Sequence, residues 1–194
     1  MSSESLRKIE HLLLSRKYAS KSAFDGVRLV HRATSEVSPQ DVDLTVKLLG
    51  REFSAPVYIA PLSGGFPGGE RFNENLARAA AEAGVPVCLG SMAPALENPT
   101  LLRTYRSARR AAPDAYIVAN VGVSSLSRYP AVRIFSYVDE IGADALVVHV
   151  NLLHEWLQGE DTSKNWVDSL AELYDLARSS GKPLLVKEVG FGLS

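Results

Sequence analysis

Short apolar runs alternate with amphipathic segments along this chain. The runs are rich in Val, Ile and Leu without strict polar alternation, which is typical of strands covered on both faces. They occupy residues 56–65, 85–91, 115–122, 145–151 and 183–192. The segments between them, 70–83, 97–111, 130–141 and 165–180, predict helices, and Gly84 and Gly142 stand where helix C-caps belong. Five strands alternating with four helices predict parallel βα units.

Polar or ionisable residues follow each predicted strand. They are Ser63-Gly64-Gly65, Gly90-Ser91, Asn120-Val121-Gly122, His149-Val150-Asn151 and Lys187-Glu188. Parallel α/β folds place their active sites at this carboxyl edge. The G-x-G-x-x-G fingerprint of an open doubly wound sheet is absent after the first run, because "SGGFPGG" has a different spacing. We therefore expect an α/β fold of the (β/α)8 TIM-barrel class.

The length of the chain bears on how much of such a barrel is present. A barrel typically needs about 250 residues, and this chain has 194. We expect residues 1–55 to form an N-terminal extension beginning with a helix, and residues 56–194 to form the first five strands of a barrel truncated after "KEVGFGLS". An open sheet edge favours association, so we expect a homo-oligomer or a partner that completes the barrel.

Composition excludes several classes of partner. With 21 basic and 22 acidic residues the net charge is −1, so the sequence has no electrostatic footprint for nucleic acid. No apolar run approaches membrane-spanning length. The single cysteine, Cys88, excludes an internal disulfide and fits a reducing compartment. We expect a cytoplasmic protein without nucleic-acid or membrane partners.

The densest group of candidate residues follows the fourth run, in "HVNLLHE". His149, Asn151, His154 and Glu155 place two imidazoles, an amide and a carboxylate on one strand end and its loop. Such a group can bind a divalent metal, hold an anion or move protons. One carboxylate suits a Mg²⁺ ion that keeps its waters and bridges to a substrate phosphate. A zinc site on the two histidines and purely structural histidines are the alternatives.

A second group of residues favours a planar cofactor. Lys187 lies inside an apolar strand, where it can form a Schiff base, pair with Glu188, or donate to an electron-accepting ring. Glycines beside Ser63, Gly64 among them, let backbone approach a flat ligand closely. Ser91 and Asn120 add hydrogen-bonding groups on neighbouring strand ends.

The first helix carries a cationic group. Arg7 and Lys8 each share a helix face with His11. The three side chains can clamp a diphosphate, or they can form a solvated helix start.

Taken in order, these motifs resemble one family, the type 2 isopentenyl diphosphate isomerases, which are FMN-dependent (β/α)8 barrels. The matching segments are "RKIEH" 7–11, "HRATSEV" 31–37, "DVDLTVKLLG" 41–50, "APLSGG" 60–65, "GS" 90–91, "ANVG" 119–122, "HVNLLHE" 149–155 and "KEVGFGLS" 187–194. The resemblance implies that Ser63, Ser91, Asn120 and Lys187 contact FMN, that Arg7 and Lys8 hold the substrate diphosphate, that His149 and Asn151 line the pocket, and that Glu155 holds Mg²⁺. It also implies that reduced flavin moves protons to and from the substrate, with NADPH or another reductant reducing it first.

The chain departs from the family pattern mainly on the substrate side. His154 stands where the family has a substrate-contacting glutamine, and Met92-Ala93 replace a Gln-Arg pair. The turn after the histidine motif is shortened to "QGED" at 158–161, and Ser63 replaces a threonine. Three interpretations remain at this point: an isomerase with compensating changes, an FMN-dependent oxidoreductase acting on another substrate, or an inactive relative.

Overall fold

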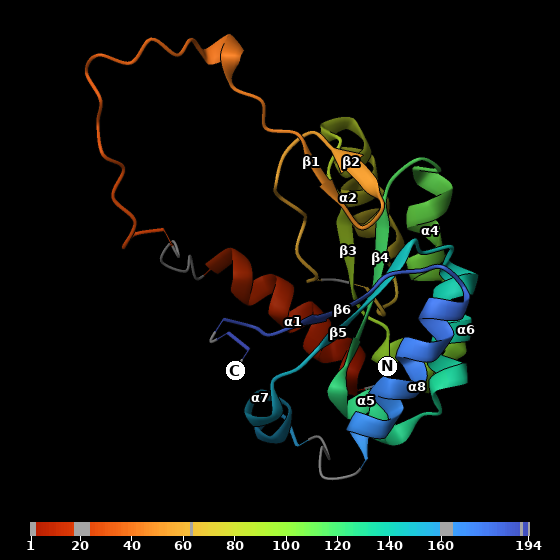
Figure 1. The fold of residues 1–194 in the computed structure, drawn as a ribbon. Helices are drawn as coiled ribbons and strands as arrows, with labels where there is room; N and C mark the ends of the chain where they lie inside the picture. Colours follow the sequence, from red (N-terminus) through yellow and green to blue (C-terminus); the bar gives the residue numbers. More distant parts are fainter. Residues whose placement is uncertain (1–2, 18–23, 63, 160–164, 191, 194) are drawn as a thin grey trace.

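A four-stranded parallel sheet, in the order β3-β4-β5-β6, forms the centre of the protein (Figure 1). The structure is a computed structural model that describes residues 3–17, 24–62, 64–159, 165–190 and 192–193. The strands are β3 (Val87–Ser91), β4 (Ile117–Gly122), β5 (Ala145–His149) and β6 (Leu184–Lys187). Each lies within one of the predicted apolar runs, so the prediction of a parallel α/β fold is confirmed.

Helices cover one face of this sheet and form the main core with it. They are α2 (Glu70–Ala83), α4 (Leu102–Ala111), α6 (Ala131–Ile141) and α8 (Trp166–Ser179). Alternate strand residues, such as Ile117, Ala119 and Val121 of β4, point into this core and are fully buried. Because both faces of the inner strands are buried, their sequences are continuously apolar.

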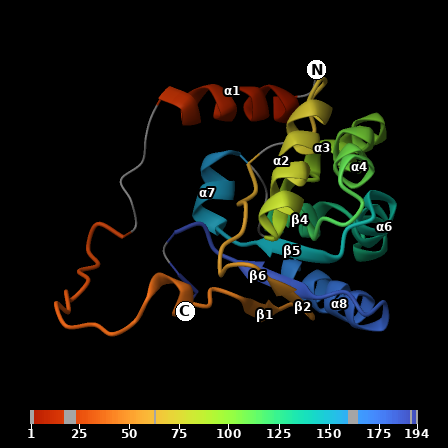
Figure 2. The same cartoon turned by 90° about the horizontal axis from the view of Figure 1, so that it is seen from above.

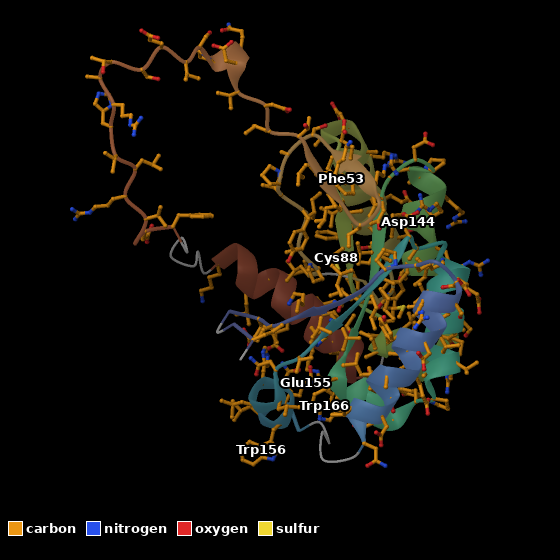
Figure 3. All side chains as sticks on the ribbon, in the orientation of Figure 1. Phe53, Cys88, Asp144, Glu155, Trp156 and Trp166 are labelled. Atoms are coloured by element: carbon orange, nitrogen blue, oxygen red, sulfur yellow. The ribbon has the colours of Figure 1, made fainter. Side chains whose placement is uncertain are left out.

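The opposite face of the sheet is covered at one end by a β-hairpin that the sequence pattern does not predict. Its strands are β1 (Val46–Leu48) and β2 (Arg51–Phe53), joined by Leu49 and Gly50 in the left-handed region. Phe53 meets Tyr116 edge to face, with 5.2 Å between ring centroids. Phe53 and Cys88 belong to a small second core on this face (Figure 3).

One further long helix, α1, and several short ones complete the described part of the chain. They are α1 (Ser3–Lys17), α3 (Ala93–Glu97), α5 (Val123–Arg128) and α7 (Leu152–Leu157), with 3-10 turns η1 (Pro39–Asp41) and η2 (Pro99–Leu101). Figure 2 shows α1 running across the top of the molecule, on the same side as α7. No helix in the described residues is long and apolar enough to cross a membrane.

Two predicted elements differ from the structure. Residues 56–62 and 64–65 do not form a strand and make one isolated parallel bridge, between Ile59 and Val87. Pro56 and Pro61 lack the N–H groups that a longer ladder needs. The helix predicted over 97–111 begins only at Leu102, because prolines at 94 and 99 divide the preceding segment into α3 and η2.

The extent of the sheet also differs from the prediction. The described residues hold four parallel strands in an open sheet, where we expected five strands of a barrel. The assignment of residues 1–55 and 56–194 to separate units stays a prediction.

Candidate active site

The strand register aligns the polar residues at the strand ends in two sets of paired positions, both at one edge of the sheet. Ser91 of β3 pairs with Asn120 of β4. Gly122 of β4 pairs with His149 of β5, and His149 in turn pairs with Lys187 of β6. Side chains in register on neighbouring strands project to the same face. The sequence prediction that these residues gather at the carboxyl edge is confirmed.

His149 links two of the predicted site residues. Its Nδ1 lies 3.1 Å from Oδ1 of Asn120, and its Nε2 lies 3.0 Å from Oε1 of Glu155. The side chains of His149 and Glu155 are 20% and 11% exposed. Both ring nitrogens are therefore engaged, which leaves neither free for a zinc ion shared with His154.

Glu155 is a buried carboxylate held in its ionised form. Burial acts to raise its pKa, but hydrogen bonds from His149 and Ser124, together with the charges of His149 and His154, outweigh burial and lower the pKa. In Figure 3 the Glu155 side chain points from α7 toward the strand ends, whereas its neighbour Trp156 points outward. The site thus contains a largely buried, ionised carboxylate that has hydrogen-bond donors in His149 and Ser124.

Asn151 begins helix α7 and has both ends of its amide engaged. Its Oδ1 accepts from the backbone N–H of His154 at 2.7 Å, which makes it the N-cap of α7. Its Nδ2 donates to Oε1 of Glu188 at 2.8 Å. In this arrangement Asn151 orients the helix that carries His154 and Glu155.

These side chains line a cavity of about 180 Å³ at the carboxyl edge. Helix α1 closes one side of it, because Nη1 of Arg7 donates to Oε1 of Gln158 at 3.1 Å. The cavity is lined by Arg7, Lys8, Pro61, Leu62, Ser91, Ala93, Asn120, Gly122, Ser124, His149, Asn151, His154, Glu155, Gln158, Lys187 and Val189.

Most of the predicted site residues meet in this cavity. Those that line it are Arg7, Lys8, Ser91, Asn120, His149, Asn151, His154, Glu155 and Lys187. Gly64 does not line it: a Cβ at this position, whose φ is +123°, would meet Cε1 of Tyr105 at 2.8 Å. Gly64 therefore allows the loop to pack on α4. Ser63 and the side chain of His11 lie outside the described residues.

Sequence reasoning missed two residues of the site and gave a third no role. Ser124 donates to Glu155, and Gln158 holds Arg7. Gly122, which stands in one of the predicted strand-end segments, leaves room for the imidazole. Ser124 lies just beyond the end of β4, where the strand-end rule could have found it. Gln158 is 151 residues from Arg7, and no local pattern links the two.

Acidic and imidazole ligands do not form a preassembled metal cage here. Within the described ranges no group of three His, Cys, Asp or Glu side chains converges as a metal site. A cation in this cavity would be held by one carboxylate, water and substrate, which is the mode that Mg²⁺ adopts.

Known proteins resemble this chain along nearly its whole length. A model of the "FMN-dependent dehydrogenase" family matches residues 16–100. Isopentenyl-diphosphate delta-isomerases from Aeropyrum pernix and Methanothermobacter thermautotrophicus are 40% and 37% identical over 98% and 96% of this chain. The one from Rickettsia prowazekii is 35% identical over 97%. By sequence, the chain is similar to these isopentenyl-diphosphate delta-isomerases over nearly all of its own length and, over residues 16–100, to the FMN-dependent dehydrogenase family.

The chain spans about half the length of these curated isomerases: 52% of the Aeropyrum, 53% of the Methanothermobacter and 56% of the Rickettsia protein. Among solved structures, a mandelate oxidase variant with 2-hydroxy-phenylacetamide superposes with a TM-score of 0.50 at 16% identity. The match covers 84% of this chain and 48% of that one. This likeness concerns the fold alone.

Some departures from the isomerase pattern are buried in the core, and others line the cavity. Met92, at the first of the two Gln-Arg positions, is fully buried in the main core, and Ala93 lines the cavity. His154 lines the cavity beside Glu155. The cavity therefore holds the cations Arg7 and Lys8 from α1, and the imidazole of His154 where the isomerase pattern has an amide.

Proposed function

We propose that this chain carries the active-site half of an FMN-dependent isomerase that converts isopentenyl diphosphate to dimethylallyl diphosphate. The observation that carries the proposal is the hydrogen-bonded row Asn120–His149–Glu155 at the carboxyl edge of a parallel sheet, within one cavity that also holds Lys187 and Arg7. The sequence similarity to isopentenyl-diphosphate delta-isomerases supports the same assignment.

FMN is the cofactor that the site residues fit. Ser91, Asn120 and Lys187 lie on β3, β4 and β6 of one sheet and offer hydroxyl, amide and ammonium groups to the same cavity. An ammonium and neutral donors match the electron-accepting edge of a flavin. When bound and reduced, with NADPH as the reductant, FMN supplies the acid–base group of the reaction.

Glu155 is the residue that fits Mg²⁺. A carboxylate offers about four lone-pair positions, and His149 and Ser124 use two of them. Glu155 lines the cavity, so an ion held there could bridge to a substrate diphosphate. His149 and Ser124 also keep the carboxylate ionised, as metal binding requires.

Arg7 and Lys8 fit the role of diphosphate clamp. Both line the cavity from α1, on the side opposite the strand ends. Isomerisation adds one proton to a terminal carbon of the substrate and removes another, with no net redox change. His149, Asn151 and His154 are the candidates to orient the substrate for these transfers, and enclosure by α1 limits the access of water.

The wider setting of the site belongs to the same proposal. We infer that the parallel sheet is part of a (β/α)8 barrel in which residues 56–194 contribute the early strands and residues 1–55 an N-terminal extension. We further propose that the chain works as a homo-oligomer on a small diphosphate. The single, buried Cys88 fits the reducing environment of the cytoplasm, where we place the protein.

A flavin titration followed by a turnover assay tests the proposal. Adding FMN to the purified chain is expected to give a shifted, protein-bound visible spectrum. Reduction with NADPH in the presence of Mg²⁺ is then expected to allow conversion of isopentenyl diphosphate, followed by proton NMR. A bound flavin with no conversion would contradict the isomerase assignment. A flavin that any 2-hydroxy acid bleaches would instead support the oxidoreductase alternative.

A further inference from the structure

Glu188 directly follows β6, and its two carboxylate oxygens have different partners. Oε1 accepts from Nδ2 of Asn151 at 2.8 Å. Oε2 accepts from the backbone N–H groups of Gly190 at 2.5 Å and Gly192 at 3.1 Å. One side chain therefore connects the loop after β6 to the loop after β5, next to the cavity-lining residue Asn151.

The side-chain amide of Asn151 cannot rotate to exchange its donor and acceptor ends. Asn151 Oδ1 accepts from the backbone N–H of His154 at 2.7 Å, so its acceptor end is fixed against the helix start. Its donor end must then face residue 188. The backbone carbonyl of Asn151 also accepts from the N–H of Glu155 at 3.0 Å. Asn151 thus sets where α7 begins and where Glu155 lies.

The chemistry of position 188 requires an acceptor at both ends. Donors converge on each carboxylate oxygen, Asn151 on one and the glycine amides on the other. A glutamine can accept from only one of these sets, and its own N–H₂ group would face a donor at the other. A carboxylate is the one side-chain group of this length that satisfies both.

We propose that Glu188 is a positioning residue of the site: through Asn151 it fixes the start of α7 and so holds Glu155 against His149. The chain of contacts is continuous, from Glu188 to Asn151, from Asn151 to the first turn of α7, and from Glu155 Oε1 to His149 Nε2 at 3.0 Å. The inference rests on the proposed function only for the role of Glu155 in binding Mg²⁺.

A reversed pair of substitutions tests this connection. Glu188→Gln places donor against donor at Asn151, and Asn151→Asp places carboxylate against carboxylate. In the double variant, Asn151→Asp with Glu188→Gln, the glutamine N–H₂ can donate to the aspartate while its carbonyl still accepts from the glycine amides. The aspartate also keeps an oxygen for the N-cap of α7. Glu172→Gln, on the exposed surface of α8, is the matched control.

Two measurements on the full chain separate the outcomes. Amide hydrogen exchange over 152–158 reports the order of α7, and electron paramagnetic resonance of Mn²⁺, used in place of Mg²⁺, reports Glu155. Each single variant is expected to speed the exchange of the His154 amide. Each is also expected to weaken Mn²⁺ binding by about tenfold, the equivalent of one lost hydrogen bond. The double variant is expected to recover most of both, and Glu172→Gln to match the wild type.

The proposal is overturned if Glu188→Gln leaves exchange in α7 unchanged, or if the double variant stays as mobile as either single one. Circular dichroism checks that each variant is folded, and a double variant that folds where a single does not counts as recovery. If the wild type fails to bind Mn²⁺, the proposed metal site fails, and the exchange data alone still decide the role of Glu188.

Discussion

Gly122 leaves the space in which the His149–Glu155 pair forms. A Cβ at this position would lie 2.7 Å from Nε2 of His149 and 3.1 Å from Oε1 of Glu155. Its φ is −84°, which any residue adopts, so Gly122→Ala tests space and not backbone strain. Because the imidazole has to move, we expect a loss of about 1–3 kcal/mol in the free energy of unfolding and weaker Mn²⁺ binding. Urea unfolding and Mn²⁺ titration measure these two effects.

The control for this substitution is Gly26→Ala. A Cβ at Gly26 would meet nothing within 4 Å, and the expected change in the free energy of unfolding is within about 0.5 kcal/mol. If Gly122→Ala behaved like Gly26→Ala, the steric role of Gly122 would be wrong.

Glu155 gives a pH dependence whose sign follows from its surroundings. Although burial acts to raise its pKa, the His149 and Ser124 hydrogen bonds lower it overall. The ionised carboxylate therefore stabilises the fold above the unfolded pKa of about 4.3, and this contribution is lost as the pH falls through the lower folded pKa.

Glu155→Gln removes this titration. We expect the variant to be less stable by about 1–3 kcal/mol above roughly pH 5, where the charged hydrogen bonds are intact. The difference from the wild type is expected to shrink as the pH falls below about 4. Urea unfolding from pH 3 to 7 measures it, and a gap that widened toward acid would contradict the lowered pKa.

The pKa of Cys88 is shifted in the opposite direction from that of Glu155. Burial raises the pKa of its thiol to about 12, against a smaller lowering effect of Lys187. Since only the thiolate reacts, we expect iodoacetamide at pH 8 to alkylate native Cys88 about a thousandfold more slowly than the urea-unfolded chain, whose cysteine titrates near 8.5. Mass spectrometry of the time course measures both rates, and equal rates would show that the thiol is neither buried nor neutral.

At the scale of elements, Gly84 decides how α2 ends. It adopts φ 66° at the C-cap and donates to the carbonyls of Ala80 and Ala81. A Cβ there would also lie 2.1 Å from Oγ of Ser54. Gly84→Ala combines left-handed strain with this clash, and we expect it to lower the thermal stability by the equivalent of about 1–3 kcal/mol.

The two causes can be separated by a second substitution. Ser54→Ala removes the clashing hydroxyl, so adding it to Gly84→Ala is expected to recover the steric part and leave about 1 kcal/mol of backbone strain. Calorimetric melting of the single and double variants tests this. A double variant no more stable than Gly84→Ala would mean that strain alone accounts for the loss.

The elements that could be predicted are those whose patterns are local and long. Residues 70–83 are a helix with those bounds, because an apolar stripe runs along them and Gly84 ends them. Helix α7 has only six residues, and its start depends on Asn151 and on Glu188, which is 37 residues away. No periodicity window detects such an element.

The same distinction holds for the site. Ser91, Asn120, His149 and Lys187 stand at strand ends, where parallel topology brings them together without any knowledge of side-chain contacts. The pairing of His149 with Glu155 depends on where α7 lies, and the contact of Arg7 with Gln158 joins segments 151 residues apart. Proximity was predictable, whereas the hydrogen-bond partners were not.

At the scale of the whole molecule, the sheet borders two cavities of opposite character. The active-site cavity lies at the carboxyl edge, and a cavity of about 240 Å³ lies on the sheet face that the hairpin partly covers. Lys187 lines both. Apart from Lys187, the second cavity is lined by apolar residues, Cys88 and Tyr58. Its rim includes exposed side chains of Leu48, Val57 and Tyr58.

This apolar face supports the proposal that the chain associates with itself. In the described residues β6 pairs on one side only, with β5, and an edge strand beside exposed apolar surface favours contact between chains. We expect light scattering after size exclusion to give a mass above that of one chain, rising with concentration. Val186 of β6 is 40% exposed and lines the cavity, so Val186→Lys is expected to shift the mass toward that of a single chain.

The matched control is Val132→Lys on the outer surface of α6, where Val132 is 68% exposed. A charge there leaves the apolar face intact, so the mass is expected to stay as in the wild type. Fluorescence of a hydrophobic dye adds an independent reading, because a face buried between chains admits less dye than the same face in a dissociated variant. A wild type that runs as a single chain at every concentration and binds dye strongly would place this face in contact with solvent, and the homo-oligomer would then have to be abandoned.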